Sequence, residues 1–157
     1  MSLKKIFRPN VAVVVINDQG LILACHRSDR KNVWQLPQGG IDEGETELEA
    51  LYRELEEEIG TREVEVIGRL SQKIRYEWPE KYYSRGYHGQ EQTYFLVRLS
   101  GDARIDLSHH SNAIEFDQCA WVTLSDFVSR ISSFKKEPYC RALAMLMQEF
   151  PNYIMDA

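Results

Sequence analysis

Apolar residues recur with two different periods along the 157-residue chain, and the change of period predicts where strands give way to helices. Two β-branched runs at 7–17 and 21–27, separated by the turn residues Asn-Asp-Gln-Gly, favour a hairpin. Further strands are expected within 64–76, at 92–99 and at 116–122, and helices at 47–59, 124–131 and 138–150. A polar loop is expected at 28–40, and an aromatic, basic loop is expected at 79–89. The order β-β-α-β-β-β-α predicts an α/β fold, an α/β/α sandwich in which helices cover a mixed β-sheet.

The first predicted helix carries signals at both of its ends. Thr46 and Glu49 form a T-x-x-E capping box before the apolar run, and Gly60 is suited to the position just after the last turn. Pro138 is expected at the first position of the last helix, where its missing N–H does no harm. The residues expected to pack this first helix on the sheet are Leu48, Leu51, Tyr52, Leu55 and Ile59.

A second face of the same helix is acidic. Glu54, Glu57 and Glu58 stand at i, i+3 and i+4, near the helix end that already carries partial negative charge. Each like-charge pair at this spacing costs about 0.2–0.5 kcal/mol, so the face either meets water or holds something positive. Arg53 is expected to pair with its helical neighbours Glu49, Glu56 and Glu57. Because a glycine-rich loop leads into the helix, backbone oxygens of the loop and the carboxylates of the helix are expected to converge on one place. Oxygen ligands of this kind suit Mg²⁺ or Mn²⁺.

Composition narrows the class of protein. The length fits one domain over residues 1–157, and the net charge of -5 argues against non-specific coating of nucleic acid, so DNA is not expected as a partner. The longest apolar run, Val11 to Ile16, is too short to span a membrane. Cys25, Cys119 and Cys140 follow no metal or redox spacing and are interpreted as reduced thiols of a cytoplasmic protein.

The string GGIDEGETELEALYRELEEEIGT matches G-x5-E-x7-R-E-U-x-E-E-x-G-U, where U is bulky and apolar. In this it resembles the signature of the Nudix hydrolases, with Gly39, Glu45 and Gly60 at the specified positions. Thr61 departs from the apolar residue of the last position, which concerns packing rather than chemistry. The resemblance implies cleavage of a nucleoside diphosphate linked to another moiety, on an α/β/α sandwich.

The resemblance also implies roles for single residues. Glu54, Glu57 and Glu58 would bind the divalent metal, more than one ion of Mg²⁺ or Mn²⁺, together with a backbone carbonyl near Gly39. Arg53 would act in the catalytic centre as an orienting group. The other residues that would hold the loop and helix together are Glu45, Gly40 and Gly60.

Segments outside the signature, among them FRPNVAVVVIN, WQLPQGGIDEGE and SSFKKEPY, resemble the bacterial RNA pyrophosphohydrolases. This group trims 5′-triphosphate RNA to a monophosphate and so promotes mRNA decay. The resemblance implies that Glu115 completes the metal site or acts as base. It places Arg8 and Arg27 near substrate phosphates and base, and Phe134 with Lys135 where a ring stacks on a nucleobase.

Two alternatives stay open at this point. One is the same chemistry on dinucleoside polyphosphates, because the group is also close to diadenosine tetraphosphate hydrolases. The other is a catalytically inactive nucleotide-binding module, which the intact Arg53 and glutamates disfavour. The 76–94 region either contacts single strands or packs on the sheet. The sequence names no protein partner and leaves open the 5′-nucleotide preference, the general base and the oligomeric state. The aromatic and basic residues of this region are Tyr76, Trp78, Lys81, Tyr82, Tyr83, Arg85 and Tyr87.

Overall fold

The computed structural model describes residues 4–108, 116–131 and 134–156. Within these ranges, eight strands form one mixed sheet, and three α-helices and one 3₁₀ turn complete the fold. The elements are β1 (Phe7–Ile16), β2 (Ile22–Arg27), β3 (Trp34–Gln35), β4 (Gln38–Gly40), α1 (Glu47–Ile59), β5 (Val64–Arg69), β6 (Ile74–Glu77), the 3₁₀ turn (Glu80–Tyr82), β7 (Gly89–Leu99), β8 (Phe116–Val122), α2 (Leu124–Arg130) and α3 (Lys136–Glu149).

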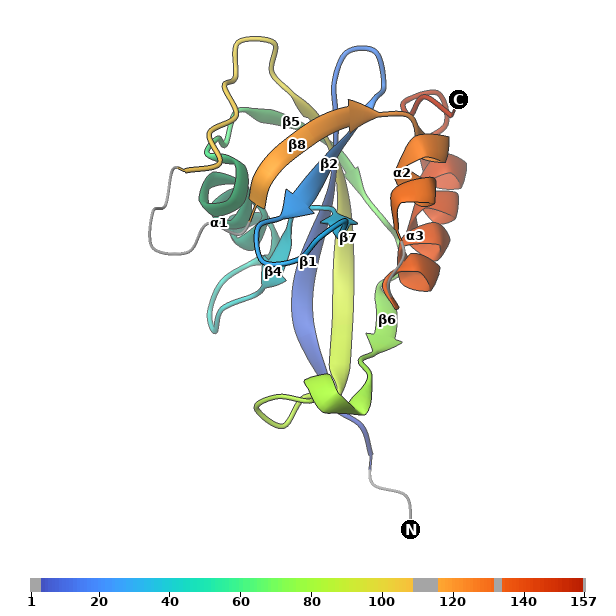
Figure 1. Ribbon diagram of the computed structural model, residues 1–157. Coiled ribbons are helices and arrows are strands. Elements are labelled where there is room, and N and C mark those ends of the chain that lie inside the picture. The colour runs from blue at the N-terminus through green and yellow to red at the C-terminus, as the bar shows by residue number, and fades with distance from the viewer. Residues whose placement is uncertain (1–3, 109–115, 132–133, 157) are drawn as a thin grey trace.

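Strand β1 organises the sheet. It runs parallel to β7 and antiparallel to β2 and β4, and the main path has the order β3-β2-β1-β7-β5. In Figure 1 α1 lies on one side of the sheet, and α2 and α3 lie on the other. The α/β sandwich with a mixed sheet that the sequence predicts is therefore confirmed.

The core lies on both faces of the sheet because β1 is apolar at every position from Val11 to Ile16. Its odd-numbered residues pack with Leu51, Leu55 and Ile59 of α1. Its even-numbered residues pack with the helices of the opposite face, including Leu143 of α3. The apolar run of β1 therefore contributes to the hydrophobic core on both faces of the sheet.

Helix α1 has the bounds and caps that the sequence predicts. The Glu49 N–H donates to Thr46 Oγ1 at 3.1 Å, and the Thr46 N–H donates to Glu49 Oε1 at 3.0 Å. Gly60 adopts φ +76°, and an added Cβ would meet the Asp106 backbone oxygen at 2.4 Å. Glycine is therefore required there both for the left-handed conformation and for space.

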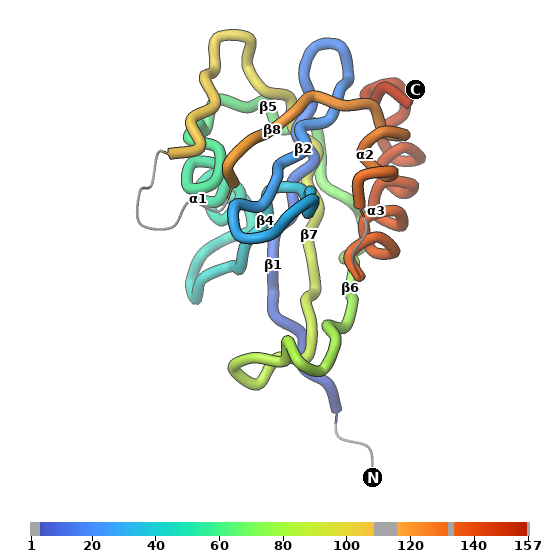
Figure 2. The backbone as a smooth tube through the Cα atoms, in the orientation of Figure 1, coloured from blue at the N-terminus to red at the C-terminus, as the bar shows by residue number. Residues whose placement is uncertain are grey.

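The buried face of α1 differs in part from the expectation. Leu48 is 45% exposed, whereas Glu54 and Glu58 are buried beside Leu51 and Leu55. The reason is that α1 packs on β4 as well as on the apolar sheet face, so its buried stripe is shifted toward the glutamates. In Figure 2 the loop that follows β4 leads directly into α1.

Three other boundaries differ from the sequence predictions. The segment expected as a polar loop at 28–40 contains β3 and β4, whose two and three residues are too short to show a strand period. Strand β7 begins at Gly89 rather than at 92, because its first residues pair with β6 and β1. Pro138 is the third rather than the first residue of α3, within the first turn where N–H groups lack helical partners. No helix of the described ranges is long and apolar enough to cross a membrane.

Candidate functional site

Arg53 joins the β4–α1 loop to the helix. Its Nε and Nη2 donate to the two carboxylate oxygens of Glu45 at 2.7 and 2.8 Å, and Nη2 also donates to the Gly40 carbonyl at 2.8 Å. Its Nη1 donates to Glu54 at 2.7 Å and to Glu57 at 3.3 Å. The bidentate contact with Glu45 is the strong form of an arginine–carboxylate pair, and it fixes the loop against α1.

The expected pairing of Arg53 with its helical neighbours is only partly right. Glu57 is a partner, but Glu49 is engaged in the capping box and Glu56 lies 3.5 Å from Arg62. The Arg53 guanidinium holds the pKa of Glu45 at about 2, well below its ordinary value. Glu45 in turn raises the pKa of Arg53, so both groups stay ionised.

Glu54 lies directly against the backbone of β4. A Cβ added to Gly39 would be 2.0 Å from the Glu54 carboxyl carbon, so the glycine is what makes room for this carboxylate. Burial raises the pKa of Glu54, although the hydrogen bond from Arg53 lowers it, and the nearby charge of Glu57 raises it further. Beside it, the buried Glu58 accepts a hydrogen bond from the Gln38 N–H at 3.1 Å.

These carboxylates suit a hard cation, although they do not form a complete site as they stand. Within the described ranges, no three His, Cys, Asp or Glu side chains converge as a ready-made metal cluster. Glu54 and Glu58 are buried at β4, whereas the Glu57 side chain is 44% exposed and contacts Arg53. Glu115, which the family resemblance adds to the set, lies outside the described residues. Two buried acids beside a glycine backbone, with carboxylate oxygens as donors, fit Mg²⁺ or Mn²⁺.

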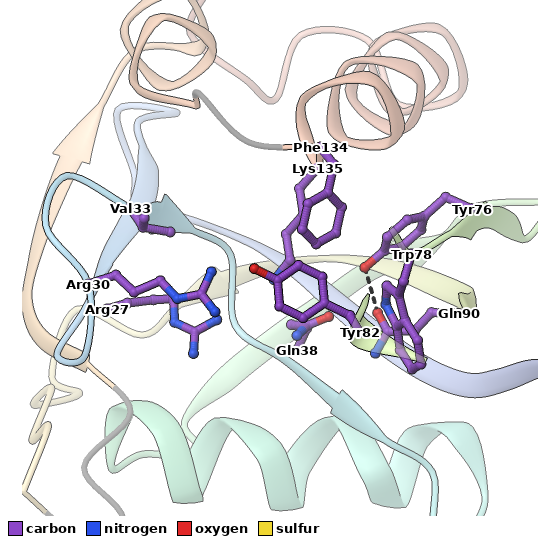
Figure 3. Close-up of a pocket in the computed structure, with 10 residues that line it drawn as sticks. All are labelled: Arg27, Arg30, Val33, Gln38, Tyr76, Trp78, Tyr82, Gln90, Phe134 and Lys135. Atoms are coloured by element: carbon purple, nitrogen blue, oxygen red, sulfur yellow. Dashed lines mark hydrogen bonds between the residues drawn. The ribbon is translucent and has the colours of Figure 1, made fainter. Parts of the chain in front are cut away.

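A pocket of about 190 Å³ opens on the other side of β4 (Figure 3). Of the residues proposed from the sequence to contact substrate, Arg27, Phe134 and Lys135 line it. Arg8 does not. Its guanidinium lies over Gly40, where an added Cβ would be 2.1 Å from it, and it makes no hydrogen bond or ion pair to the part of the chain that the structure describes. The full lining is Arg27, Arg30, Val33, Gln38, Tyr76, Trp78, Tyr82, Gln90, Phe134 and Lys135.

One wall of this pocket is aromatic. The Phe134 ring is 39% exposed, and its centroid lies 6.4 Å from that of Tyr76 and 5.7 Å from that of Tyr82. The Arg30 guanidinium lies 5.7 Å from the Tyr82 ring centroid, so a cation stands next to the three aromatic rings on the Tyr82 side. Burial raises the pKa of Tyr76 to about 12, and its hydroxyl donates to Gln90 at 2.8 Å.

The aromatic loop is therefore divided between two roles. Trp78 and Tyr82 line the pocket, as Figure 3 shows, whereas Tyr83 bonds to Glu77 and packs on His88 at 4.8 Å between ring centroids. Sequence analysis did not single out Arg30, Gln38 or Gln90 as lining residues. Neither spacing nor composition distinguishes these side chains, because Gln38 and Gln90 are placed by the packing of β4 and β7, and Arg30 by the turn between β2 and β3.

Strand β4 connects the pocket to the acidic cluster. The Gln38 side chain lines the pocket, and its backbone N–H binds Glu58 on α1. Gly39 follows and makes room for Glu54. A molecule with a planar ring in the pocket could therefore reach the glutamates with a phosphate chain.

A family model described as the NUDIX domain matches residues 6–142. The chain is 42% identical over 155 residues to a protein named RNA pyrophosphohydrolase from Helicobacter pylori (strain ATCC 700392 / 26695), which covers 94% of this chain and 97% of that one. It is 42% identical over 149 residues to a protein of the same name from Campylobacter jejuni, with 91% and 94% covered. The solved structure of the E. coli dihydroneopterin triphosphate pyrophosphohydrolase superposes with a TM-score of 0.69 at 19% identity, covering 92% and 97%, and supports the fold alone.

Proposed function

The chain belongs to the Nudix family, and we propose that it is a metal-dependent RNA 5′-pyrophosphohydrolase, which converts 5′-triphosphate ends of RNA to 5′-monophosphates. Water would attack the phosphate chain, and pyrophosphate would leave. The family match over residues 6–142 confirms the resemblance to Nudix hydrolases that the signature sequence indicates, and the chain is a Nudix pyrophosphohydrolase. By exposing a monophosphate end, the reaction would promote mRNA decay. We assign it to the cytoplasm, where its transcripts would be found.

The observation that carries this proposal is the position of β4 between two unlike sites. On one side stand the buried carboxylates of Glu54 and Glu58, and on the other a pocket with aromatic rings and cationic side chains. Hydrolysis of a phosphate anhydride needs neutralised phosphate oxygens and a positioned water. Recognition of a single-stranded RNA end needs rings on which a base can stack. Identity of about 40% to named RNA pyrophosphohydrolases over more than 90% of both chains favours RNA as the substrate.

Glu54, Glu57 and Glu58, with backbone oxygen near Gly39, would hold the divalent ions, more than one Mg²⁺ or Mn²⁺, and we include Glu115 in this set as a proposal. When bound, such ions neutralise phosphate oxygens and lower the pKa of water. Glu57 would have to exchange its contact with Arg53 for the metal site.

The remaining residues would bind and orient the substrate. Arg53 holds the β4–α1 loop on the helix, which fixes the Gly39-Gly40 backbone beside the acidic cluster. Arg8, which lies over this backbone without a partner among the described residues, is suited to a phosphate oxygen. In the pocket, Phe134 would stack on a base, and Lys135 and Arg27 would contact its edge or a phosphate.

A substrate comparison tests this proposal. Turnover is measured on 5′-triphosphate RNA, diadenosine tetraphosphate and free nucleoside triphosphates at one Mg²⁺ concentration, with Glu57→Gln as the inactive control. We expect the highest kcat/KM on 5′-triphosphate RNA. A higher value on diadenosine tetraphosphate would establish the dinucleoside polyphosphate alternative. No turnover above the control on any substrate would identify a nucleotide-binding module.

A further inference from the structure

The imidazole of His26, at the end of β2, is engaged on three sides. Its Nδ1 lies 2.7 Å from Asp117 Oδ1 on β8, and the Asn32 backbone N–H donates to its Nε2 at 3.2 Å. Its ring packs edge-on against Trp34, with centroids 5.1 Å apart, and its side chain is only 13% exposed. A surface histidine would not be expected to satisfy both nitrogens and one ring edge at once.

These contacts determine where the imidazole proton lies. A backbone N–H can only donate, so the His26 Nε2 that faces Asn32 must accept and carries no hydrogen. The hydrogen of the neutral ring is then on Nδ1, where it is donated to Asp117. The carboxylate therefore selects the tautomer that the Asn32 contact needs.

The Asn32 contact lies in the turn between β2 and β3. Asn32 has φ +56°, a left-handed conformation that is uncommon for non-glycine residues and that asparagine adopts more readily than most. Another bond across the turn runs from the Arg27 N–H to the Val33 carbonyl at 2.9 Å. His26 thus supplies one of the hydrogen bonds that close the 28–33 segment.

This segment aims two arginines at the substrate pocket. Asp29 accepts from Arg27 Nε at 2.9 Å and from Nη2 at 2.7 Å, so a residue of the turn sets the plane of the Arg27 guanidinium. Arg30 belongs to the turn itself and reaches Tyr82. Figure 3 shows both guanidinium groups pointing into the pocket from the same side. The β2–β8 pairing shifts register between His26 and Arg27, where β2 ends.

We propose that His26 is a positioning residue of the substrate pocket: through Asn32 it fixes the 28–33 turn and thereby aims Arg27 and Arg30. The identity of the substrate rests on the proposed function, whereas the clamp between His26, Asp117 and Asn32 does not. His26 itself need not touch substrate, because it acts through the backbone of the turn.

The test compares His26→Phe with matched variants. Phenylalanine keeps a ring to pack on Trp34 but removes both nitrogens. We expect KM for 5′-triphosphate RNA to rise roughly tenfold while kcat stays within about twofold, since only binding contacts are misaligned. Asp117→Asn keeps an acceptor for the Nδ1 hydrogen and should retain a nearly normal KM. Gln118→Ala, an exposed neighbour on β8, is the control without effect.

A double-mutant cycle identifies the route of the effect. In a background with Arg27→Ala and Arg30→Ala, His26→Phe should raise KM no further, because its targets are gone. An equal fold-change in both backgrounds, or a fall in kcat together with thermal stability, would mean general structural support and would overturn the proposal.

Hydrogen exchange of the Asn32 amide separates this proposal from the assignment of RNA as substrate. Exchange should be faster in His26→Phe than in the wild type, and unchanged exchange would overturn the clamp whatever the substrate. If the wild type does not cleave 5′-triphosphate RNA, the proposed function fails. The kinetic comparison is then made on whichever of the three phosphate substrates it cleaves, and an unchanged KM there overturns the positioning role.

Discussion

Replacing Gly39 by alanine would test whether this glycine exists to admit Glu54. The new Cβ would lie 2.0 Å from the Glu54 carboxyl carbon and 2.1 and 2.3 Å from its oxygens, far inside van der Waals contact. The φ angle of Gly39 is not in the left-handed region, so alanine suits the backbone and the clash is the main effect. Since α1 fixes the Glu54 backbone, the carboxylate must swing away from β4.

The clash is expected to lower both the stability of the fold and the catalytic efficiency. Overpacking of this kind lowers the free energy of unfolding by about 1–3 kcal/mol. For a domain of this length each kcal/mol lowers Tm by about 2–4 °C, so we expect a fall of roughly 2–12 °C. Moving Glu54 also breaks its 2.7 Å contact with Arg53. Loss of a supporting contact at a metal site typically reduces activity or metal affinity by about tenfold to a hundredfold, and we expect kcat/KM to fall by that factor.

Thermal unfolding with and without Mg²⁺, and steady-state kinetics on 5′-triphosphate RNA, measure both effects. Gly101→Ala is the matched control, because no heavy atom lies within 4 Å of its added Cβ. The control should keep wild-type values. If Gly39→Ala kept a normal kcat/KM and the same stabilisation by Mg²⁺, the close approach of Glu54 to β4 would have no functional meaning.

Further predictions concern the acidic cluster, the aromatic pocket and the β4–α1 loop. Excess chelator should abolish turnover, and added Mg²⁺ should raise Tm because the ion binds the folded state; full turnover in chelator would contradict the metal assignment. Glu57→Gln should lower kcat at least about a hundredfold with little change in Tm, since an amide is a poorer ligand for a hard cation; near-normal rates would mean that the acidic face is only solvated. Phe134→Ala should raise KM for RNA about tenfold to a hundredfold through the loss of one stack, and unfolding in a melt would instead make the ring part of the core. Because the pKa of Glu45 is depressed to about 2, its contribution to stability is complete above pH 4.5 and is lost as pH falls toward 2; urea unfolding of Glu45→Gln should lack this part of the acid dependence.

The bounds of α1 could be predicted because the interactions that set them are local. The capping box spans the four residues from Thr46 to Glu49, and Gly60 ends the helix through its own left-handed conformation. Strands β3 and β4 could not be predicted, because two or three residues show no alternation. Their existence depends on pairing with β2 and β1, which lie elsewhere in the chain.

In the candidate site, too, features set by local sequence could be predicted and features set by tertiary packing could not. Helical spacing places Glu54, Glu57 and Glu58 on one face, but it does not indicate that two of them are buried and one is exposed. That difference follows from the packing of β4 on α1. The Glu45 and Gly40 contacts of Arg53 likewise come from the loop, so the helical wheel, which compares only residues of one helix, indicates Glu57 but neither of these partners.

Arg53 also limits how the charge of this site can be balanced. A guanidinium has five N–H donors, and the structure gives Arg53 five hydrogen bonds: two to Glu45 and one each to Glu54, Glu57 and the Gly40 carbonyl. Its donors are therefore fully used: three fasten the loop, and two bind Glu54 and Glu57 of the acidic cluster. A further carboxylate would have to replace one of these five contacts. Glu54, buried with a raised pKa, keeps an unfavourable charge that we expect a bound cation to balance.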